Sequence, residues 1–79
     1  MTLSDAIKKR VFELVEGSRS TLTSLCINSK ITPSTMFDFM SGKSKHLSIV
    51  TIKKLCNGAN LTLKQFFSRD YFNSIDEDI

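Results

Sequence analysis

The sequence predicts a small all-α domain built from five short helices. Apolar residues recur at helical spacing in five segments, and a serine or threonine that can cap a helix precedes each of them. No segment alternates apolar and polar residues for long enough to form a β-strand, and no internal repeat is evident. The helices are expected near residues 3–16, 22–28, 33–41, 49–57 and 63–68. At 79 residues, the chain has room for one domain with one modest core.

The first predicted helix is expected to begin after a cap at Thr2 or Ser4 and to end at Gly17. Its buried face is predicted from five apolar residues at helical spacing, which are Leu3, Ile7, Val11, Leu14 and Val15. Its remaining surface carries three consecutive bases, which are Lys8, Lys9 and Arg10. We interpret these bases as a solvated face, with direct contact to phosphate groups as the alternative.

The second predicted helix is short and leads into a tight turn. Thr21 can cap this helix, and Leu25 and Cys26 are expected on its buried side. The chain then turns over residues 28–31 before a third helix begins, which is the spacing of a helix-turn-helix.

The third predicted helix has both of its ends marked. Thr32 can cap it, Pro33 suits its first position, and Gly42 suits the left-handed residue after its end. Its apolar stripe consists of Met36, Phe39 and Met40. Its opposite face carries small side chains that form hydrogen bonds, which are Ser34, Thr35 and Asp38. Phe37 lies on this polar side, and we expect it to be partly buried against the first or fourth helix, with an exposed apolar contact as the alternative.

The last two predicted helices complete the core. Ser48 can cap the fourth helix, Gly58 is expected to end it, and Thr62 can cap the fifth. The fourth helix is expected to bury Ile49, Ile52, Leu55 and Cys56, and the fifth Leu63, Phe66 and Phe67. The predicted common core is Leu14, Leu25, Cys26, Met36, Phe39, Ile52, Leu55 and Phe66.

The charges are distributed unevenly along the chain. Residues 1–69 hold all 11 bases and four acids, a net charge of +7, whereas residues 70–79 hold four acids and no base. We therefore divide the chain into a basic domain, residues 1–69, and a short acidic C-terminal tail, residues 70–79. A basic domain favours an anionic partner such as nucleic acid, although a solvated surface gives the same excess.

The sequence shows no features of a membrane protein, an enzyme or a metal-binding protein. The sequence has no apolar run long enough to cross a membrane and no apolar block of a signal peptide, so we expect a cytoplasmic protein without a membrane partner. Its single histidine has no carboxylate or cysteine partner at a catalytic spacing, and no glycine-rich phosphate loop occurs. Cys26 and Cys56 lie in apolar helical patterns, as buried thiols do. No enzyme activity, cofactor, metal site or small-molecule substrate is therefore expected.

Several residues of the middle helices match a known pattern. Cys26 is a small residue where the second helix meets the third, and apolar residues follow at Ile31, Met36 and Phe39. The third helix ends in the polar, glycine and lysine residues Ser41-Gly42-Lys43. In this order and spacing, the chain resembles the lambda-repressor-like, or XRE/Cro-type, family of helix-turn-helix DNA-binding regulators. The resemblance covers residues 3–72 and implies the five-helix fold of that family. It also implies a left-handed position in the turn, often glycine in such proteins, where Lys30 stands here; a residue other than glycine is strained there but tolerated.

The resemblance also implies where DNA binds. The third helix of such proteins lies in the major groove, so the expected base-contacting residues are Pro33, Ser34, Thr35 and Asp38. The expected phosphate-contacting residues are Thr21, Ser41, Lys43, Ser44, Lys45 and His46. Serine and threonine read base edges, and an aspartate accepts a hydrogen bond from cytosine. Asp38 is equally well interpreted as a surface residue with no base contact.

Two functions remain open from the sequence. The first is a sequence-specific transcriptional regulator, most simply a repressor, that binds double-stranded DNA as a homodimer on two half-sites. The expected dimer surface lies around apolar residues near the C-terminus, which are Phe67, Tyr71, Phe72 and Ile75. The second is a protein-interaction module, such as an antitoxin or an adaptor, that keeps the same fold. Small side chains on the third helix and the acidic tail suit the second function, whereas the basic domain suits the first.

Overall fold

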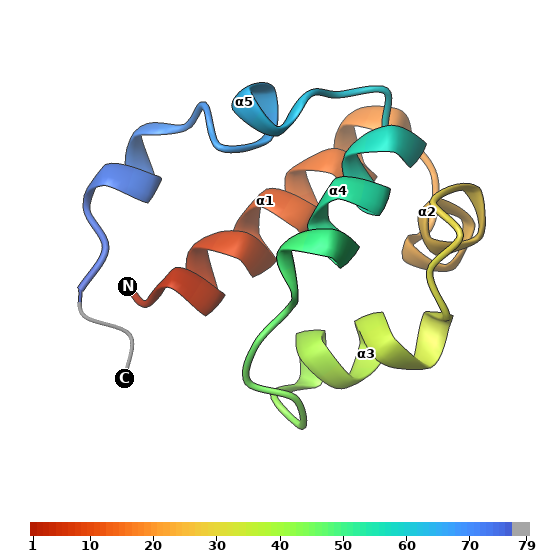
Figure 1. Ribbon diagram of the computed structural model, residues 1–79, viewed down its shortest axis with the longest axis horizontal. Coiled ribbons are helices and arrows are strands. Elements are labelled where there is room, and N and C mark those ends of the chain that lie inside the picture. Colours follow the sequence, from red (N-terminus) through yellow and green to blue (C-terminus); the bar gives the residue numbers. More distant parts are fainter. Residues whose placement is uncertain (77–79) are drawn as a thin grey trace.

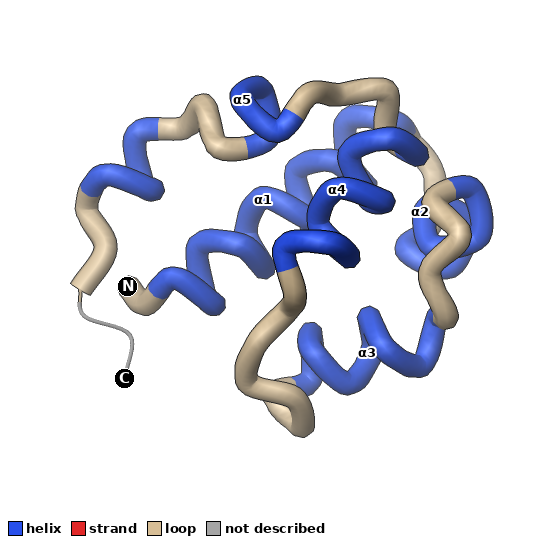
Figure 2. Tube along the Cα trace, in the orientation of Figure 1, coloured by secondary structure: helices blue, strands red, loops and turns tan. Residues whose placement is uncertain are grey.

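The computed structural model describes residues 1–76, which form helices and no strand (Figures 1 and 2). The elements are α1 (Leu3–Ser18), α2 (Leu22–Asn28), α3 (Pro33–Ser41), α4 (Ile49–Gly58), α5 (Leu63–Phe66) and the 3₁₀ helix η1 (Asp70–Asn73). The prediction of an all-α fold with five α-helices is therefore confirmed. Glu77 and Asp78, which were counted in the acidic tail, lie outside the described residues.

The helices pack around one apolar core. α2 contacts both α3 and α4, α4 contacts α5, and η1 contacts α1. In Figure 1, α3 lies at one end of the molecule, and a long loop joins it to α4. The predicted core is confirmed except at Leu14, which is only partly buried because it lines a hollow between α1 and the α4–α5 turn. The other seven predicted side chains are buried.

α1 begins as predicted but ends later. Thr2 accepts a hydrogen bond from the Asp5 backbone N–H, and the Asp5 side chain accepts one from the Thr2 N–H, which makes a capping box. Gly17 does not end the helix, because the left-handed residue is Arg19, at φ 55°. The prediction that Leu3 is buried is also wrong: it is 40% exposed, in the first turn at the edge of the domain.

The remaining helices agree with the prediction except in the cap of α3, the exposure of Ile49 and the length of α5. Ser48 and Thr62 cap α4 and α5 through their side chains, as Thr21 caps α2. Thr32 occupies the cap position of α3 without making the expected side-chain hydrogen bond. Ile49 is 58% exposed, not buried, because it opens the first turn of α4 beside an exposed loop. α5 is also shorter than predicted, because Phe67 already serves as its C-terminal cap.

The structure reveals an internal repeat that the sequence analysis missed. Residues 25–37 and residues 55–67 contain three similar pairs of residues at the same spacing. The pairs are Leu-Cys, Ile-Thr and Met-Phe in the first segment, and Leu-Cys, Leu-Thr and Phe-Phe in the second. The two turns have the same conformation: Lys30 and Asn60 are both left-handed, with φ 58° and 61°. The residue after each left-handed position donates its N–H to a cysteine carbonyl. Ile31 donates to Cys26 at 2.9 Å, and Leu61 donates to Cys56 at 2.8 Å. The expected left-handed Lys30 is thus confirmed, and the α2–α3 and α4–α5 pairs are two copies of one design.

The C-terminal ends of α2 and α4 approach each other closely. Gly58 is the last residue of α4, and a Cβ atom added there would lie 2.8 Å from the Cα atom of Ser29. Ser29 is buried, and its hydroxyl has no hydrogen-bond partner within residues 1–76. Glycine at position 58 is therefore required by the close packing of the two helix ends, and not by its backbone conformation.

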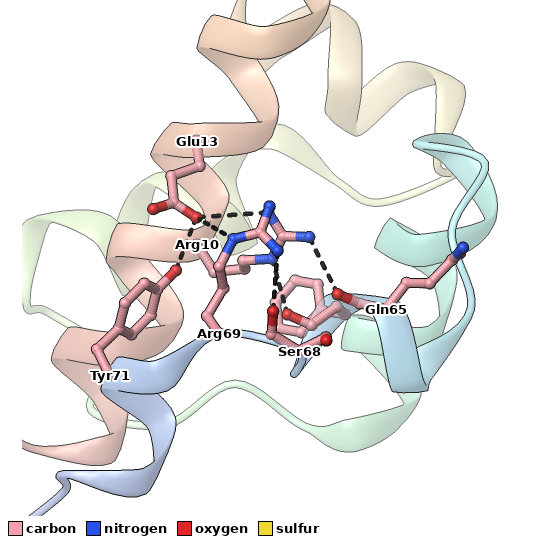
Figure 3. A network of polar contacts seen from close by, with 7 residues as sticks. Arg10, Glu13, Gln65, Ser68, Arg69 and Tyr71 are labelled. Atoms are coloured by element: carbon pink, nitrogen blue, oxygen red, sulfur yellow. Dashed lines mark hydrogen bonds and ion pairs between the residues drawn. The ribbon is translucent and has the colours of Figure 1, made fainter.

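Arg10 is buried, so the prediction of a solvated face is wrong at this residue. The residue is only 4% exposed. Its Nε donates to the Phe66 carbonyl at 2.7 Å, and its Nη2 donates to the Gln65 carbonyl at 3.1 Å (Figure 3). The guanidinium group thus pairs the Phe66 carbonyl at the C-terminal end of α5, where a helix leaves its own acceptors unpaired, and adds a second donor to the Gln65 carbonyl, which also accepts the Ser68 N–H at 3.3 Å.

Glu13 connects the C-terminal segment to α1. One of its oxygens accepts a hydrogen bond from the Tyr71 hydroxyl at 2.8 Å and pairs with the Arg69 Nε at 3.3 Å and the Arg10 Nη1 at 3.4 Å (Figure 3). The Lys9 ammonium lies 4.6 Å from the centre of the Tyr71 ring. These contacts hold η1 against α1, so residues 70–73 pack on the domain.

The aromatic residues expected at a dimer surface pack on one another within the chain. The ring centres of Phe67 and Phe72 are 5.0 Å apart, and those of Phe66 and Phe67 are 4.9 Å apart, both with edge-to-face geometry. Phe67 and Phe72 are partly buried against the core. Much of the apolar surface that suggested a dimer interface is therefore covered by the chain itself.

Tyr71 is expected to make stability fall at alkaline pH. Burial, followed by the hydrogen bond to Glu13 and the charge of that carboxylate, raises the pKa of Tyr71 from 10.0 to about 12. The stabilisation is present below pH 10 and is lost as the pH rises towards about 12, because the unfolded chain releases the proton first. The free-energy difference between the parent and Tyr71→Phe proteins should therefore change over this window, measured by urea unfolding at several pH values. Since Tyr71 is the only tyrosine, its titration can be followed by absorbance; a midpoint near 10 would contradict this prediction.

Candidate nucleic-acid interface

α3 presents a polar face to solvent. Met36 and Phe39 are fully buried, which turns the opposite side of the helix outward. Ser34 and Thr35 are exposed on that side, whereas Pro33 is half-buried. Three of the four expected base-contacting residues thus lie together on α3, where Ser34 and Thr35 can meet another molecule without any rearrangement of the core.

Asp38, the fourth expected base-contacting residue, is half-buried. Its backbone carbonyl accepts hydrogen bonds from the Ser44 N–H at 2.9 Å and from the Ser41 hydroxyl at 3.2 Å. Asp38 therefore has a structural role through its backbone, in holding the loop that follows α3. Ser41 uses its proton inside this arrangement, so its hydroxyl oxygen remains only as an acceptor.

The loop after α3 carries exposed basic side chains on a fixed backbone. Lys43, Ser44, Lys45 and His46 are all exposed. The Ser4 hydroxyl donates to the Lys45 carbonyl at 2.7 Å, which ties the loop to the first turn of α1. Together with the contact to Asp38, this bond fixes the loop at two points. Lys43 and Lys45 therefore project from a backbone that is already ordered.

A polar hollow of about 280 Å³ lies between this loop and α1. Its lining residues are Thr2, Ser4, Asp5, Lys8, Gly42, Ser44, Lys45 and His46. The structure thus brings Ser44, Lys45 and His46 together, as expected, and adds Lys8 from α1. Sequence reasoning favoured a solvated face for Lys8, with phosphate contact as the alternative, since nothing in the local pattern of α1 indicates which loop will pack beside it.

Thr21 occupies a separate position at the start of α2. Its hydroxyl accepts a hydrogen bond from the Ser24 N–H at 3.1 Å and donates to the Ser24 hydroxyl at 3.0 Å. Thr21 is exposed, but it does not line the hollow between the loop and α1. Any contact from Thr21 to an anion would therefore come in addition to its role as a helix cap.

Two large apolar side chains near α3 are exposed. Phe37, which was expected to be partly buried, is 46% exposed and does not pack on the core. Ile27, on α2, is 65% exposed. An aromatic ring on an otherwise polar helix face is unusual for a residue with no internal role, so Phe37 is a candidate contact residue, which is the alternative that the sequence left open.

Other kinds of site have less support. Cys26 and Cys56 are buried free thiols, and burial raises the pKa of both. No three histidine, cysteine or acidic side chains of residues 1–76 gather in a way that could hold a metal ion. A second hollow, of about 610 Å³, opens beside α1, but Arg10, Glu13 and Arg69 on its wall are paired with one another. Within the same residues, no helix has the length and apolar character of a membrane span.

The arrangement that remains is a surface formed by the outer face of α3, the loop after it and the first turns of α1. It combines exposed hydroxyls on a helix with lysines on an ordered loop. Comparison of the chain with protein-family models, with curated proteins and with solved structures finds no match.

Proposed function

We propose that the chain is a sequence-specific DNA-binding regulator with a lambda-repressor-like helix-turn-helix formed by α2, the turn and α3. The observation that supports this most strongly is the position of Lys43 and Lys45. They follow directly after a short helix with an exposed polar face, on a loop fixed at two points. If α3 lies in a major groove, this loop meets the sugar-phosphate backbone beside it.

In this proposal the residues of α3 read the bases. The hydroxyls of Ser34 and Thr35 donate to or accept from base edges, and the methyl group of Thr35 contacts a thymine methyl. Asp38 accepts from a cytosine amino group, and Pro33 fixes the first turn of the helix. The exposed ring of Phe37 adds an apolar contact with a thymine methyl.

The phosphate contacts are tested by replacing Lys43 with alanine. This change should weaken binding to selected and random duplexes alike and reduce the magnitude of the salt slope by about one unit, since one phosphate contact is lost. The measurement is fluorescence anisotropy over a range of salt concentrations, with duplexes selected from a random-sequence library and with unselected DNA.

Ser34→Ala is the matched comparison for Lys43→Ala. It removes no charge, so the salt slope should stay the same, while discrimination at one base pair should fall by about 1 kcal/mol. A Lys43→Ala protein with the parent affinity and the parent salt slope would refute the proposed placement of the loop on the DNA backbone.

We propose further that the chain binds its operator as a homodimer. Two copies on two half-sites gain affinity and specificity over one copy, whose α3 presents only a few small side chains. The surface proposed for pairing is the part of the Phe67, Tyr71, Phe72 and Ile75 region that stays partly exposed. The same titrations report this state as two chains bound to each duplex.

One observation favours the second function, a protein-interaction module such as an antitoxin or an adaptor. Ile27 and Phe37 expose large apolar side chains, as protein-binding surfaces do. Under this alternative, Phe37→Ala would abolish binding to a protein partner, and no duplex would be retained from the random library at low salt.

A further inference from the structure

The polar hollow beside α1 has the components of a phosphate site. Lys8, Lys45 and His46 reach it from two segments that are far apart in the sequence. The bond from the Ser4 hydroxyl to the Lys45 carbonyl sets the distance between these segments. Three groups that carry or can carry positive charge therefore share one hollow without needing a large movement of either segment.

Lys8 is oriented by the core. Its ammonium lies 5.4 Å from the centre of the Phe39 ring, and Phe39 is fully buried on the inner side of α3. An ammonium group near a ring face is attracted to it, which favours the rotamers that direct Lys8 towards α3. Lys9, one residue later, instead approaches Tyr71. The two neighbouring lysines thus lie on different sides of α1 and contact different aromatic rings.

The hollow also contains one acid. Asp5 lines it, but its carboxylate accepts a hydrogen bond from the Thr2 N–H at 3.4 Å and lies in the first turn of α1, where the helix dipole favours a negative charge. Lys8 and Lys45 outnumber this acid, and the Ser44 hydroxyl adds a neutral group that can donate a hydrogen bond. The balance of charge in the hollow favours an anion.

We propose that this hollow binds one phosphate of a DNA backbone, with Lys8 as a phosphate contact supplied by α1. The inference rests on the proposed function, because the same loop that carries Lys43 forms one wall of the hollow. The loop that carries Lys43 also carries Lys45 and His46, and these two residues line the hollow together with Lys8. In this proposal α1, and not α3, contacts this phosphate and so helps to fix the position of the protein on the duplex.

The test compares charge-matched variants of α1 on one short random-sequence duplex. Lys8→Ala should weaken binding at low salt on the order of tenfold and reduce the magnitude of the salt slope by about one unit. Lys8→Arg should keep the parent slope. Lys9→Ala removes the same charge from the other side of α1 and should leave the slope unchanged. Asp5→Asn keeps an oxygen for the capping box and should strengthen binding, because it removes a negative charge from the hollow.

Separate measurements check that each variant is folded. Circular dichroism and thermal unfolding of Lys8→Ala should match those of the parent protein. If Lys8→Ala is destabilised, the comparison passes to Lys8→Gln and Asp5→Asn, which change the charge with little change in size. Absence of any change in slope in the folded variants overturns the inference.

The outcomes separate this inference from the proposed function. If Lys43→Ala lowers the salt slope while Lys8→Ala does not, the proposed function stands and the α1 phosphate site is refuted. If the parent protein binds no duplex at low salt, both are refuted. Inorganic phosphate is the second probe: NMR shifts of Lys8 and His46 that saturate with inorganic phosphate but do not respond to duplex would assign the hollow to a free phosphate and overturn the inference.

Discussion

Replacing Arg10 with alanine should destabilise the domain by about 2–5 kcal/mol. The change leaves the buried carbonyl of Phe66 without its donor, and a buried acceptor left unpaired costs about 1–3 kcal/mol. The Gln65 carbonyl loses the charged donor but still accepts the Ser68 N–H at 3.3 Å. It also removes one of the three groups that pair with Glu13. Urea unfolding followed by circular dichroism measures this effect as a lower midpoint at an unchanged m-value.

Two variants make the Arg10 prediction specific. Lys9→Ala removes a charge from the neighbouring position together with the contact to the Tyr71 ring, but Lys9 is exposed, so its effect should stay within about 1 kcal/mol. Arg10→Lys keeps the charge but lacks the planar fork that reaches two carbonyls, so most of the loss should persist. If Arg10→Ala were as stable as Lys9→Ala, the assigned role of the buried guanidinium would be wrong.

Gly58→Ala is the second change expected to have a large effect. Inside an unobstructed helix this substitution stabilises a protein, because alanine restricts the unfolded chain. At Gly58 the new Cβ atom meets both the backbone and the hydroxyl of Ser29, so α2 and α4 must separate. Overpacking of this kind costs about 1–3 kcal/mol, and it reverses the sign of the usual effect.

Gly17→Ala is the matched control for Gly58→Ala. Gly17 also lies inside a helix, and a Cβ atom added there meets nothing within 4 Å. This change should stabilise the domain by about 0.5–1 kcal/mol. Combining Ser29→Gly with Gly58→Ala should restore only part of the loss, because the Ser29 Cα atom remains in the way. Equal stability of the two alanine variants would show that the helix ends can part freely.

The features predicted correctly from the sequence are local ones. A cap requires only a hydroxyl and the N–H three residues later, so Thr2, Thr21 and Ser48 were identified from the sequence. Helical spacing likewise identified buried residues such as Met36 and Phe39. The same spacing failed for Leu3 and Ile49, because periodicity does not indicate where the neighbouring element ends.

The features that were missed depend on contacts between distant segments. Arg10 was assigned to the surface because its partners, the carbonyls of Gln65 and Phe66, come more than 50 residues later. For Lys8 the sequence favoured a solvated face and left phosphate contact as the alternative, because the packing of the α3–α4 loop against Ser4 is not visible in the local pattern. By contrast, the exposure of Ser34, Thr35 and the loop lysines followed from the orientation of α3 alone. The outer face of the candidate site was therefore predictable, and its contribution from α1 was not.

The repeated design of α2–α3 and α4–α5 affects how freely each copy can evolve. Gln65 in the second copy corresponds to Thr35 in the first, and Gln65 accepts a hydrogen bond from the Thr62 N–H at 2.9 Å. The cap of α3 makes no such bond, so Thr35 has no equivalent task. Substitutions at Gln65 are therefore expected to act on the fold. Under the proposed function, substitutions at Ser34 and Thr35 would change the contacts of α3 with DNA without removing a cap.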